Sequence, residues 1–231
     1  MRFAPFGFEN NVTSSVLPSG LQWDLWQGNY TANASTWVST ANGTITATML
    51  AGGFAKTTNG VTGLNFTGTT LQKLFTVPTG TWDSNAGGTL IIYMNITSTT
   101  NKDLWCKQTT SSNGMGVDFT NNPLYFVRAA TSSNQITTTA NTSRGTHVYS
   151  FATNGGNDQT AQYYLDKTAP TMSYSSTTNT SWNNGYDFIF GYGYQWTDPS
   201  IQGVLNRIMF FNRKLSAAEV SQVVDYCTTN A

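Results

Sequence analysis

The clearest pattern of apolar and polar positions lies near the C-terminal end, where residues 204–211 are almost all apolar. Ile208 and Phe210 fall on one face of an extended chain. Met209 and Phe211 fall on the other face. A short run that is apolar on both faces is typical of a β-strand covered on both sides. We therefore predict a buried strand here.

The pattern then changes from a period of two to the period of a helix. Ser216 is a favourable N-cap, and Glu219 three residues later completes a capping box. Leu215 and Val220 occupy the positions of a hydrophobic staple. The apolar residues that recur at i, i+3, i+4 and i+7 are Val220, Val223, Val224 and Cys227. This spacing predicts one short helix with a single buried face.

Upstream, shorter apolar or alternating runs predict further strands. Residues 20–26 alternate with a period of two, and residues 88–96 are apolar enough for a central strand. The other predicted strands lie at residues 60–68, 74–78, 103–106, 116–119, 124–127, 147–151, 161–167 and 187–191. With 231 residues, the chain is long enough for one large β-sandwich. We therefore predict an all-β protein of antiparallel strands.

Three of these segments carry a family resemblance. Residues 205–220 match, nearly residue for residue, the end of laminin-G-like, concanavalin A-like jelly rolls, where a strand such as I-D-E-V-R-I-Y-N-R precedes A-L-S-x-x-E-I. Residues 60–68 resemble the family's G-x-A-L-x-F-D-G strand, with Leu64 and Phe66 expected to point inward. The opening, residues 20–44, resembles modules found in phage and prokaryotic surface proteins.

The resemblance covers residues 20–227. It implies a two-sheet antiparallel jelly-roll sandwich over residues 20–231, with one short C-terminal helix. Residues 1–19 contain three Phe and two Pro without periodicity, so we expect an extended N-terminal arm. The closing strand departs from the family at its acidic pair, which is Asn206 and Arg207 here.

Relatives in this family often hold Ca²⁺ at a loop rim through Asp and Asn oxygens. The resemblance therefore implies a calcium site at Asp166, Asp187 and Asp198, which lie at predicted strand ends. Several acids usual in the family are missing, so solvated turn residues are the alternative. We expect no other cofactor.

Composition restricts the partners. Only 10% of the residues are charged, and 11 basic residues balance 11 acidic ones. A net charge of zero does not attract nucleic acid or an anionic membrane, so we expect neither as a partner. Residues 1–9 lack the apolar core of a signal peptide. Cys106 and Cys227 are compatible with one disulfide or with two buried thiols.

The residues argue against catalysis. Some relatives cleave glycans with two carboxylates on one strand, but the two Glu here are Glu9, in the arm, and Glu219, in the capping box. Two Asp residues from different strands remain the alternative. His147 has no Ser and Asp at triad spacing, so we expect a packed or surface histidine. We predict no catalytic residue and no enzyme.

Aromatic side chains in Gly- and Asn-rich loops are the remaining candidates for a binding site. They are Trp182, Tyr186, Tyr192, Tyr194 and Trp196. Such rings stack on sugar faces and also contact protein subunits. Packing in the core or bracing of loops is the third interpretation.

The arm offers a second kind of contact. Phe3, Phe6 and Phe8 need a surface to cover them, either their own domain or a neighbouring subunit. We therefore predict a non-enzymatic structural module of a phage-like virus particle: a capsid decoration, fibre or minor capsid protein on the virion surface. Its partners would be other virion proteins or its own copies, with surface glycans as additional ligands. The alternative is a carbohydrate-binding lectin module of a cell-surface or secreted protein.

Overall fold

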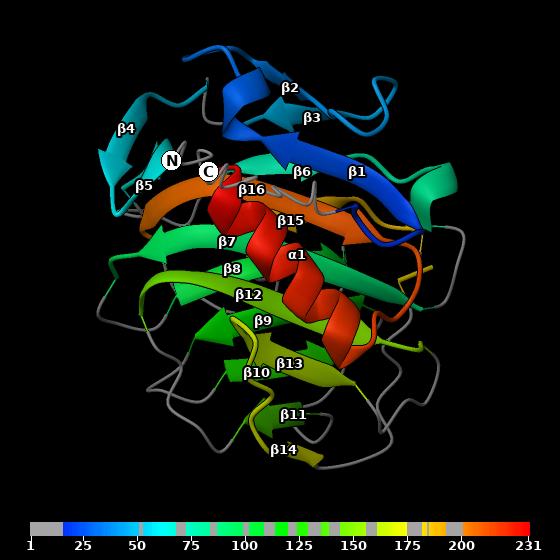
Figure 1. Cartoon of the computed structure of the whole chain (residues 1–231). Coiled ribbons are helices and arrows are strands. Elements are labelled where there is room, and N and C mark those ends of the chain that lie inside the picture. The colour runs from blue at the N-terminus through cyan, green and yellow to red at the C-terminus, as the bar shows by residue number, and fades with distance from the viewer. Residues whose placement is uncertain are drawn as a thin grey trace, which may run out of the picture.

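A computed structural model describes most of the chain. The described residues are 16–50, 53–67, 73–83, 87–98, 102–108, 114–119, 124–128, 135–138, 144–155, 161–174, 182–183, 185–192 and 201–231. They form two antiparallel sheets, and the helix α1 (Ala217–Thr229) lies across the outer face of one of them (Figure 1). The predicted β-sandwich with a C-terminal helix is confirmed.

The first sheet carries the helix. Its strand order is β13 (Gln162–Leu165), β12 (Gly145–Thr153), β7 (Gly88–Ile96), β16 (Gly203–Phe211), β5 (Val61–Phe66) and β4 (Lys56–Asn59). β1 (Leu21–Trp26) also pairs with β16, alongside its second half. The predicted central strand, β7, lies between β12 and β16 and pairs with both along its length.

The second sheet packs behind the first. Its strand order is β14 (Met172–Tyr174), β11 (Gln135–Thr138), β10 (Leu124–Arg128), β9 (Gly114–Phe119), β8 (Lys102–Gln108), β15 (Phe188–Phe190), β6 (Phe75–Val77), β3 (Thr46–Met49) and β2 (Thr36–Val38). The predicted meander is β8, β9 and β10. Two short 3₁₀ turns, η1 (Gln27–Asn29) and η2 (Thr81–Asp83), lie in the connections.

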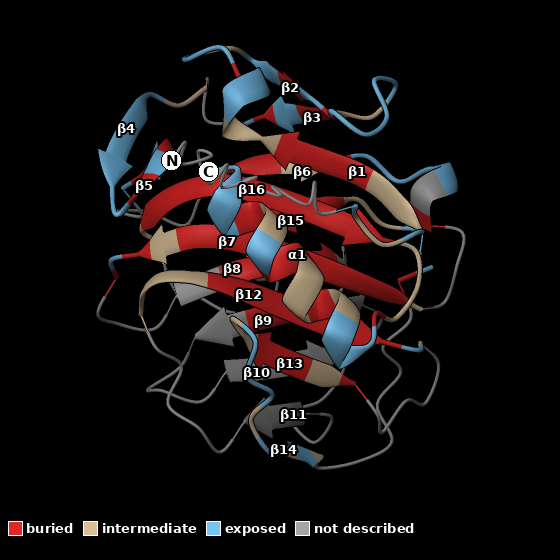
Figure 2. Cartoon of the chain, in the orientation of Figure 1, coloured by how far each residue is buried: buried red, intermediate tan, exposed pale blue. Residues whose placement is uncertain are grey.

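Two apolar layers hold the structure together, because alternate side chains of the first sheet point to opposite faces. The inner layer, between the sheets, is rich in aromatic rings such as Trp23, Trp37 and Trp105. The outer layer lies under α1 and includes Ile91 and Met209. Figure 2 shows the strands beneath α1 as buried. No helix among the described residues is long and apolar enough to span a membrane.

The strand β16 changes partner in its middle. Residues 203–205 pair with β5, residues 207–211 pair with β1, and the register against β7 shifts between Leu205 and Arg207. The extra residue, Asn206, makes a bulge that reverses the alternation of faces. Leu205 and Ile208 therefore both face the inner layer, and Arg207 faces the side that α1 covers.

Sequence signals for α1 are confirmed in detail. The Ser216 side chain caps the backbone N–H of Glu219, and the Glu219 carboxylate accepts from the Ser216 backbone N–H at 2.9 Å. Arg213 also donates to this carboxylate. These hydrogen bonds lower the pKa of Glu219 to about 2. The buried face of the helix consists of Val220, Val223, Val224 and Cys227, as the spacing predicts.

Five strands have no counterpart in the sequence prediction: β2, β3, β4, β11 and β14. They are three or four residues long, and β3, β4 and β11 are rich in Thr. β4 is exposed at all four positions and β14 lies at an edge of the second sheet. Short segments without an apolar alternation carry no signal that distinguishes them from loops.

The predicted arm is described only from Val16 onward, so Phe3, Phe6 and Phe8 lie outside the described residues. Leu17 packs against the layer under α1, and Arg213 donates to the Ser19 carbonyl at 3.0 Å. This last part of the arm lies on its own domain. Cys106 and Cys227 are both buried and are not joined in a disulfide.

Candidate functional site

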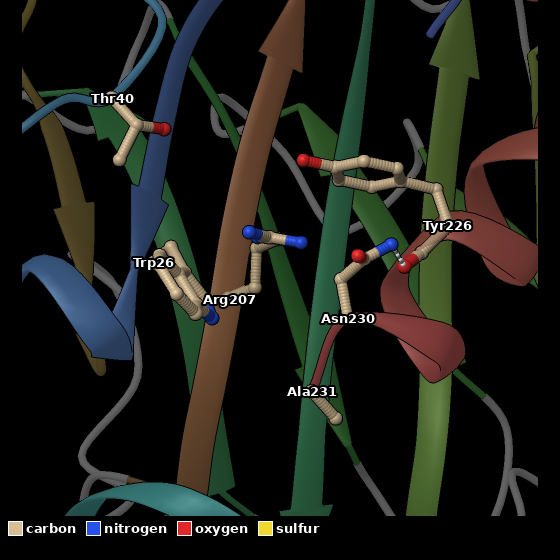
Figure 3. A pocket seen from close by; sticks show the side chains of 6 residues that line it. All are labelled: Trp26, Thr40, Arg207, Tyr226, Asn230 and Ala231. Atoms are coloured by element: carbon tan, nitrogen blue, oxygen red, sulfur yellow. Dashed lines mark hydrogen bonds between the residues drawn. The ribbon is translucent and has the colours of Figure 1, made fainter. Parts of the chain in front are cut away.

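A pocket opens on the outer face of the first sheet, where β1, β16 and the C-terminal end of α1 meet (Figure 3). Its volume is about 430 Å³, within the range of small-molecule sites. It is lined by Trp26, Thr40, Arg207, Tyr226, Asn230 and Ala231. Arg207 is almost fully buried, the two rings are half-buried, and the other three are exposed. The pocket thus has a cationic floor, aromatic walls and a polar rim.

The floor is the guanidinium of Arg207, which is 3% exposed. Trp26 is its direct cross-strand partner on β1, so the two side chains share one face of the sheet. The guanidinium carbon lies 5.1 Å from the Trp26 ring centre and 4.8 Å from that of Tyr226. Both distances are those of cation–π contacts. Figure 3 shows the guanidinium between the two rings.

Asp24 balances the charge of Arg207 on the same face of the first sheet. The Asp24 Oδ1 lies 3.2 Å from the Arg207 Nε, and both side chains are at most 5% exposed. The Thr40 hydroxyl donates to the other oxygen, Oδ2, at 2.7 Å. Burial raises the pKa of the Asp24 carboxyl above its ordinary value, and Arg207 and Thr40 act against this rise.

Several donors at the floor have no acceptor. The Arg207 Nε and Nη1 are buried and make no hydrogen bond of good geometry with any described residue, and the same holds for the Trp26 Nε1. Buried donors without an acceptor cost about 1–3 kcal/mol each. The floor can therefore accommodate a bound group that supplies hydrogen-bond acceptors.

Local contacts hold the walls of the pocket. The Trp26 ring lies over Gly28, where a Cβ atom would overlap its six-membered ring. Tyr226 lies in the last turns of α1, and its carbonyl accepts from the Asn230 backbone and side-chain nitrogens at 3.1 and 2.8 Å. Beside Arg207, burial raises the pKa of the Cys227 thiol to about 12, so this thiol stays protonated at neutral pH.

A second buried ion pair lies in the second sheet. Lys107 is 0% exposed, and its Nζ lies 2.9 Å from the Asp83 Oδ2 and also donates to the Tyr186 carbonyl. The Thr79 hydroxyl donates to the same Asp83 oxygen, and the Thr79 N–H donates to Asp187 at 2.8 Å. Burial lowers the pKa of Lys107, and Asp83 acts against this shift. This pair fastens the segment that precedes β15.

Three of the five predicted loop aromatics, Trp182, Tyr186 and Tyr192, lie among the described residues. Trp182 is a core residue, 0% exposed, whose ring stacks on Trp105 with centres 5.1 Å apart. Its ring therefore has no face for a glycan or a subunit. Tyr186 and Tyr192 are half-buried, one before and one after β15 in the sequence. The Lys73 Nζ lies 5.2 Å from the centre of the Tyr192 ring. Tyr194 and Trp196 lie outside the described residues.

Of the candidate calcium ligands, Asp166 and Asp187 are described, and they lie beside different sheets. Asp166 accepts from the Val148 N–H at 2.9 Å and lies 2.8 Å from the His147 Nδ1, beside β12 in the first sheet. Asp187 accepts from Thr79 near the second sheet, and Asp198 lies outside the described residues. Within the described part of the chain, no three His, Cys, Asp or Glu side chains lie close enough to hold a metal.

The pocket at Arg207 was not predicted from the sequence. One signal was available: Arg207 interrupts an otherwise apolar strand, and a charge at a buried position needs a partner. The period-two pattern of residues 20–26 places Asp24 and Trp26 on one face. What the sequence does not show is that β1 lies beside β16.

Comparison with known proteins supports the fold. No protein-family profile and no curated protein sequence matches the chain. Among solved structures, the Trypanosoma rangeli sialidase in complex with sialic acid matches with 13% identity and a TM-score of 0.62, over 90% of this chain and 33% of the sialidase chain. The binding domain of Paraclostridial Mosquitocidal Protein 1 matches with 10% identity and a TM-score of 0.62, over 90% and 52%.

A third structure aligns over nearly its whole length. Domain 4 of AbnA, a GH43 extracellular arabinanase from Geobacillus stearothermophilus in complex with arabinotriose, matches with 14% identity and a TM-score of 0.60, over 88% of this chain and 98% of that domain. This chain spans about a third of the sialidase chains. At these identities the likeness establishes a shared fold, in agreement with the jelly-roll sandwich that the sequence resemblance implies.

Proposed function

We propose that this chain is a non-catalytic carbohydrate-binding domain and that its ligand binds in the pocket around Arg207. The observation that carries the proposal is the pocket itself: two aromatic rings flank a buried guanidinium under a rim of hydroxyl and amide groups. Aromatic faces pack on the C–H faces of sugar rings. A few fixed polar groups then orient the sugar hydroxyls.

The described lining of the pocket contains no Asp or Glu side chain, which favours binding over catalysis. Glycoside hydrolysis by the common mechanism needs two carboxyl groups on either side of the scissile bond. None of the six described residues that line the pocket is Asp or Glu. The carboxylate of Asp24, beside Arg207, is buried and accepts a hydrogen bond from Thr40. A sugar held here would meet no acid–base pair.

The structural neighbours support the same class of function. Domain 4 of the arabinanase was solved with arabinotriose, and it is a separate domain of an enzyme. A second neighbour is described as the binding domain of its protein. We infer by analogy that the fold serves here to hold a ligand.

A glycan array followed by calorimetry on the best ligands tests the proposal. Trp26→Ala should weaken binding at least about tenfold, because it removes one wall of the pocket. Tyr192→Ala, at the alternative aromatic site next to β15, should bind like the wild type. The reverse outcome would move the site to the β15 loops. Binding to no glycan on the array would contradict the proposed function.

The virion role and the virion-surface location stay predictions. The expected docking residues, Phe3, Phe6 and Phe8, lie outside the described residues. Deletion of residues 1–19 should abolish incorporation into particles while the domain remains folded. Normal incorporation of the truncated protein would rule out docking through the arm.

A further inference from the structure

We propose that the sugar bound in this pocket is acidic and that its carboxylate is held by the Nη edge of Arg207, with the sugar ring against Trp26. This inference rests on the proposed function and specifies its ligand class. A uronic acid or a sialic acid has the required chemistry, a carboxylate attached to a pyranose ring.

The charges of the lining favour an anion. Among the side chains of the six described lining residues, Arg207 alone carries a formal charge. Its counter-ion, Asp24, lies 3.2 Å from the Nε and is not part of the lining. Asp24 thus leaves the two Nη nitrogens unengaged, and Nη1 makes no hydrogen bond with any described residue. A guanidinium binds a carboxylate through two parallel hydrogen bonds, a geometry that a single sugar hydroxyl cannot match.

The balance of donors and acceptors points the same way. The floor contains buried donors without an acceptor, the Arg207 Nη1 and the Trp26 Nε1. A carboxylate only accepts hydrogen bonds, whereas each sugar hydroxyl also donates one and needs an acceptor of its own. The hydroxyl and amide acceptors of the lining belong to Thr40, Tyr226 and Asn230. Thr40 and Asn230 are exposed at the rim, where the hydroxyls of the sugar would lie.

Calorimetry on matched pairs of glycans tests the ligand class. Each pair shares one configuration and differs by a carboxylate: methyl glucuronide against methyl glucoside, methyl galacturonide against methyl galactoside, and sialyllactose against lactose. In at least one pair, the acidic member should bind about tenfold more tightly or better than the neutral one, the difference that about 1.4 kcal/mol produces.

Variants then connect this preference to the pocket. Arg207→Gln should remove the preference for the acid. Because Arg207 is buried, a rim variant provides an independent test: Asn230→Asp places a carboxylate at the exposed edge and should weaken the acidic member at least about tenfold by repulsion. Asn230→Ala removes the same side-chain contact without adding charge and should retain the preference. Asn59→Asp, on the exposed strand β4, controls for the change in net charge.

The possible outcomes separate the two proposals. The inference is supported if the wild type prefers the acidic member, Asn230→Asp abolishes this preference, and Asn59→Asp leaves it intact. Equal or tighter binding of the neutral members would overturn the inference that the ligand is acidic. It would still be consistent with the proposed carbohydrate binding. An acid preference that neither Arg207→Gln nor Asn230→Asp changes would place the ligand elsewhere and overturn the inference. Binding of neither member of any pair, together with a blank glycan array, would overturn both proposals.

Discussion

Two buried ion pairs of this protein differ in how completely their polar atoms are satisfied. Lys107 and Asp83 form a closed pair: the Lys107 ammonium also donates to the Tyr186 carbonyl, and Asp83 also accepts from Thr79. Arg207 and Asp24 form an open pair, in which the Arg207 Nε and Nη1 make no well-formed hydrogen bond among the described residues. A pocket lies above the open pair.

The difference indicates different roles. A buried charge that is fully hydrogen-bonded fixes the segments around it, and at Lys107 these include the backbone before β15. A buried charge with donors to spare keeps a desolvation cost that a ligand can offset on binding. We interpret the closed pair as structural and the open pair as the floor of a binding site.

The largest effect should come from breaking the closed pair. Lys107→Met leaves the Asp83 carboxylate buried without its cation and should lower the free energy of unfolding by about 3–5 kcal/mol. Urea unfolding followed by tryptophan fluorescence measures this change. Asp83→Asn combined with Lys107→Met should recover part of the loss, because it removes the unpaired charge. A loss below about 1 kcal/mol for Lys107→Met would contradict a structural role for this pair.

Replacing the cation of the open pair by Met should lower the free energy of unfolding less, but should abolish glycan binding. Arg207→Met removes an ion pair without a well-formed hydrogen bond from the Arg207 Nε, whereas Lys107→Met removes hydrogen bonds to both Asp83 and the Tyr186 carbonyl. We expect a loss of about 1–3 kcal/mol in unfolding free energy together with loss of glycan binding. Urea unfolding and calorimetry on the same sample measure both. If Arg207→Met destabilised the protein as much as Lys107→Met, the distinction between the two pairs would fail.

A pH series examines Asp24 in the open pair. Burial raises the pKa of Asp24, so the folded protein holds this proton more tightly than the unfolded chain. The resulting stabilisation is fully present below the unfolded pKa, and it is lost as the pH rises through the folded value. The wild type should therefore lose stability relative to Asp24→Asn as the pH rises from about 4 toward neutrality. A difference that does not change with pH would indicate an unshifted Asp24.

The smallest change in stability should come from Gly28→Ala, which adds one methyl group beside the pocket. The new Cβ would overlap the Trp26 ring and displace it, and Gly28 itself is exposed. We expect a change in stability within about 0.5 kcal/mol and a threefold to tenfold loss of binding, the effect of about 0.5–1.5 kcal/mol of aromatic contact. Calorimetry measures the binding. Unchanged affinity would show that the ligand does not need Trp26 in this position.

Sequence patterns predicted the parts of the fold that local chemistry determines. The apolar run of β16 and the capping box at Ser216 depend on neighbouring residues, and both are confirmed. Strands such as β4 depend on pairing with a distant strand, and their polar residues do not show it. Trp182 lies in a loop-like stretch of sequence, but its ring fills a space between the sheets.

The pocket could not be predicted for a related reason. Trp26 and Tyr226 are 200 positions apart in the sequence, and they meet because β1 pairs with β16 and α1 crosses the same face. The side to which Arg207 points depends on the bulge at Asn206. Counted from Leu205, strict alternation would have placed Arg207 between the sheets, on the opposite face.

The most direct test of the pocket is a ¹H–¹⁵N NMR titration that follows the indole N–H signals of the seven tryptophans. Trp26→Phe identifies the Trp26 signal, and the ligand is the acidic glycan that binds best. The account predicts that the Trp26 Nε1–H signal shifts most during the titration, while the buried Trp23 and Trp182 signals stay in place. A bound glycan that leaves the Trp26 signal unmoved, with shifts confined to another tryptophan such as Trp196, would contradict it.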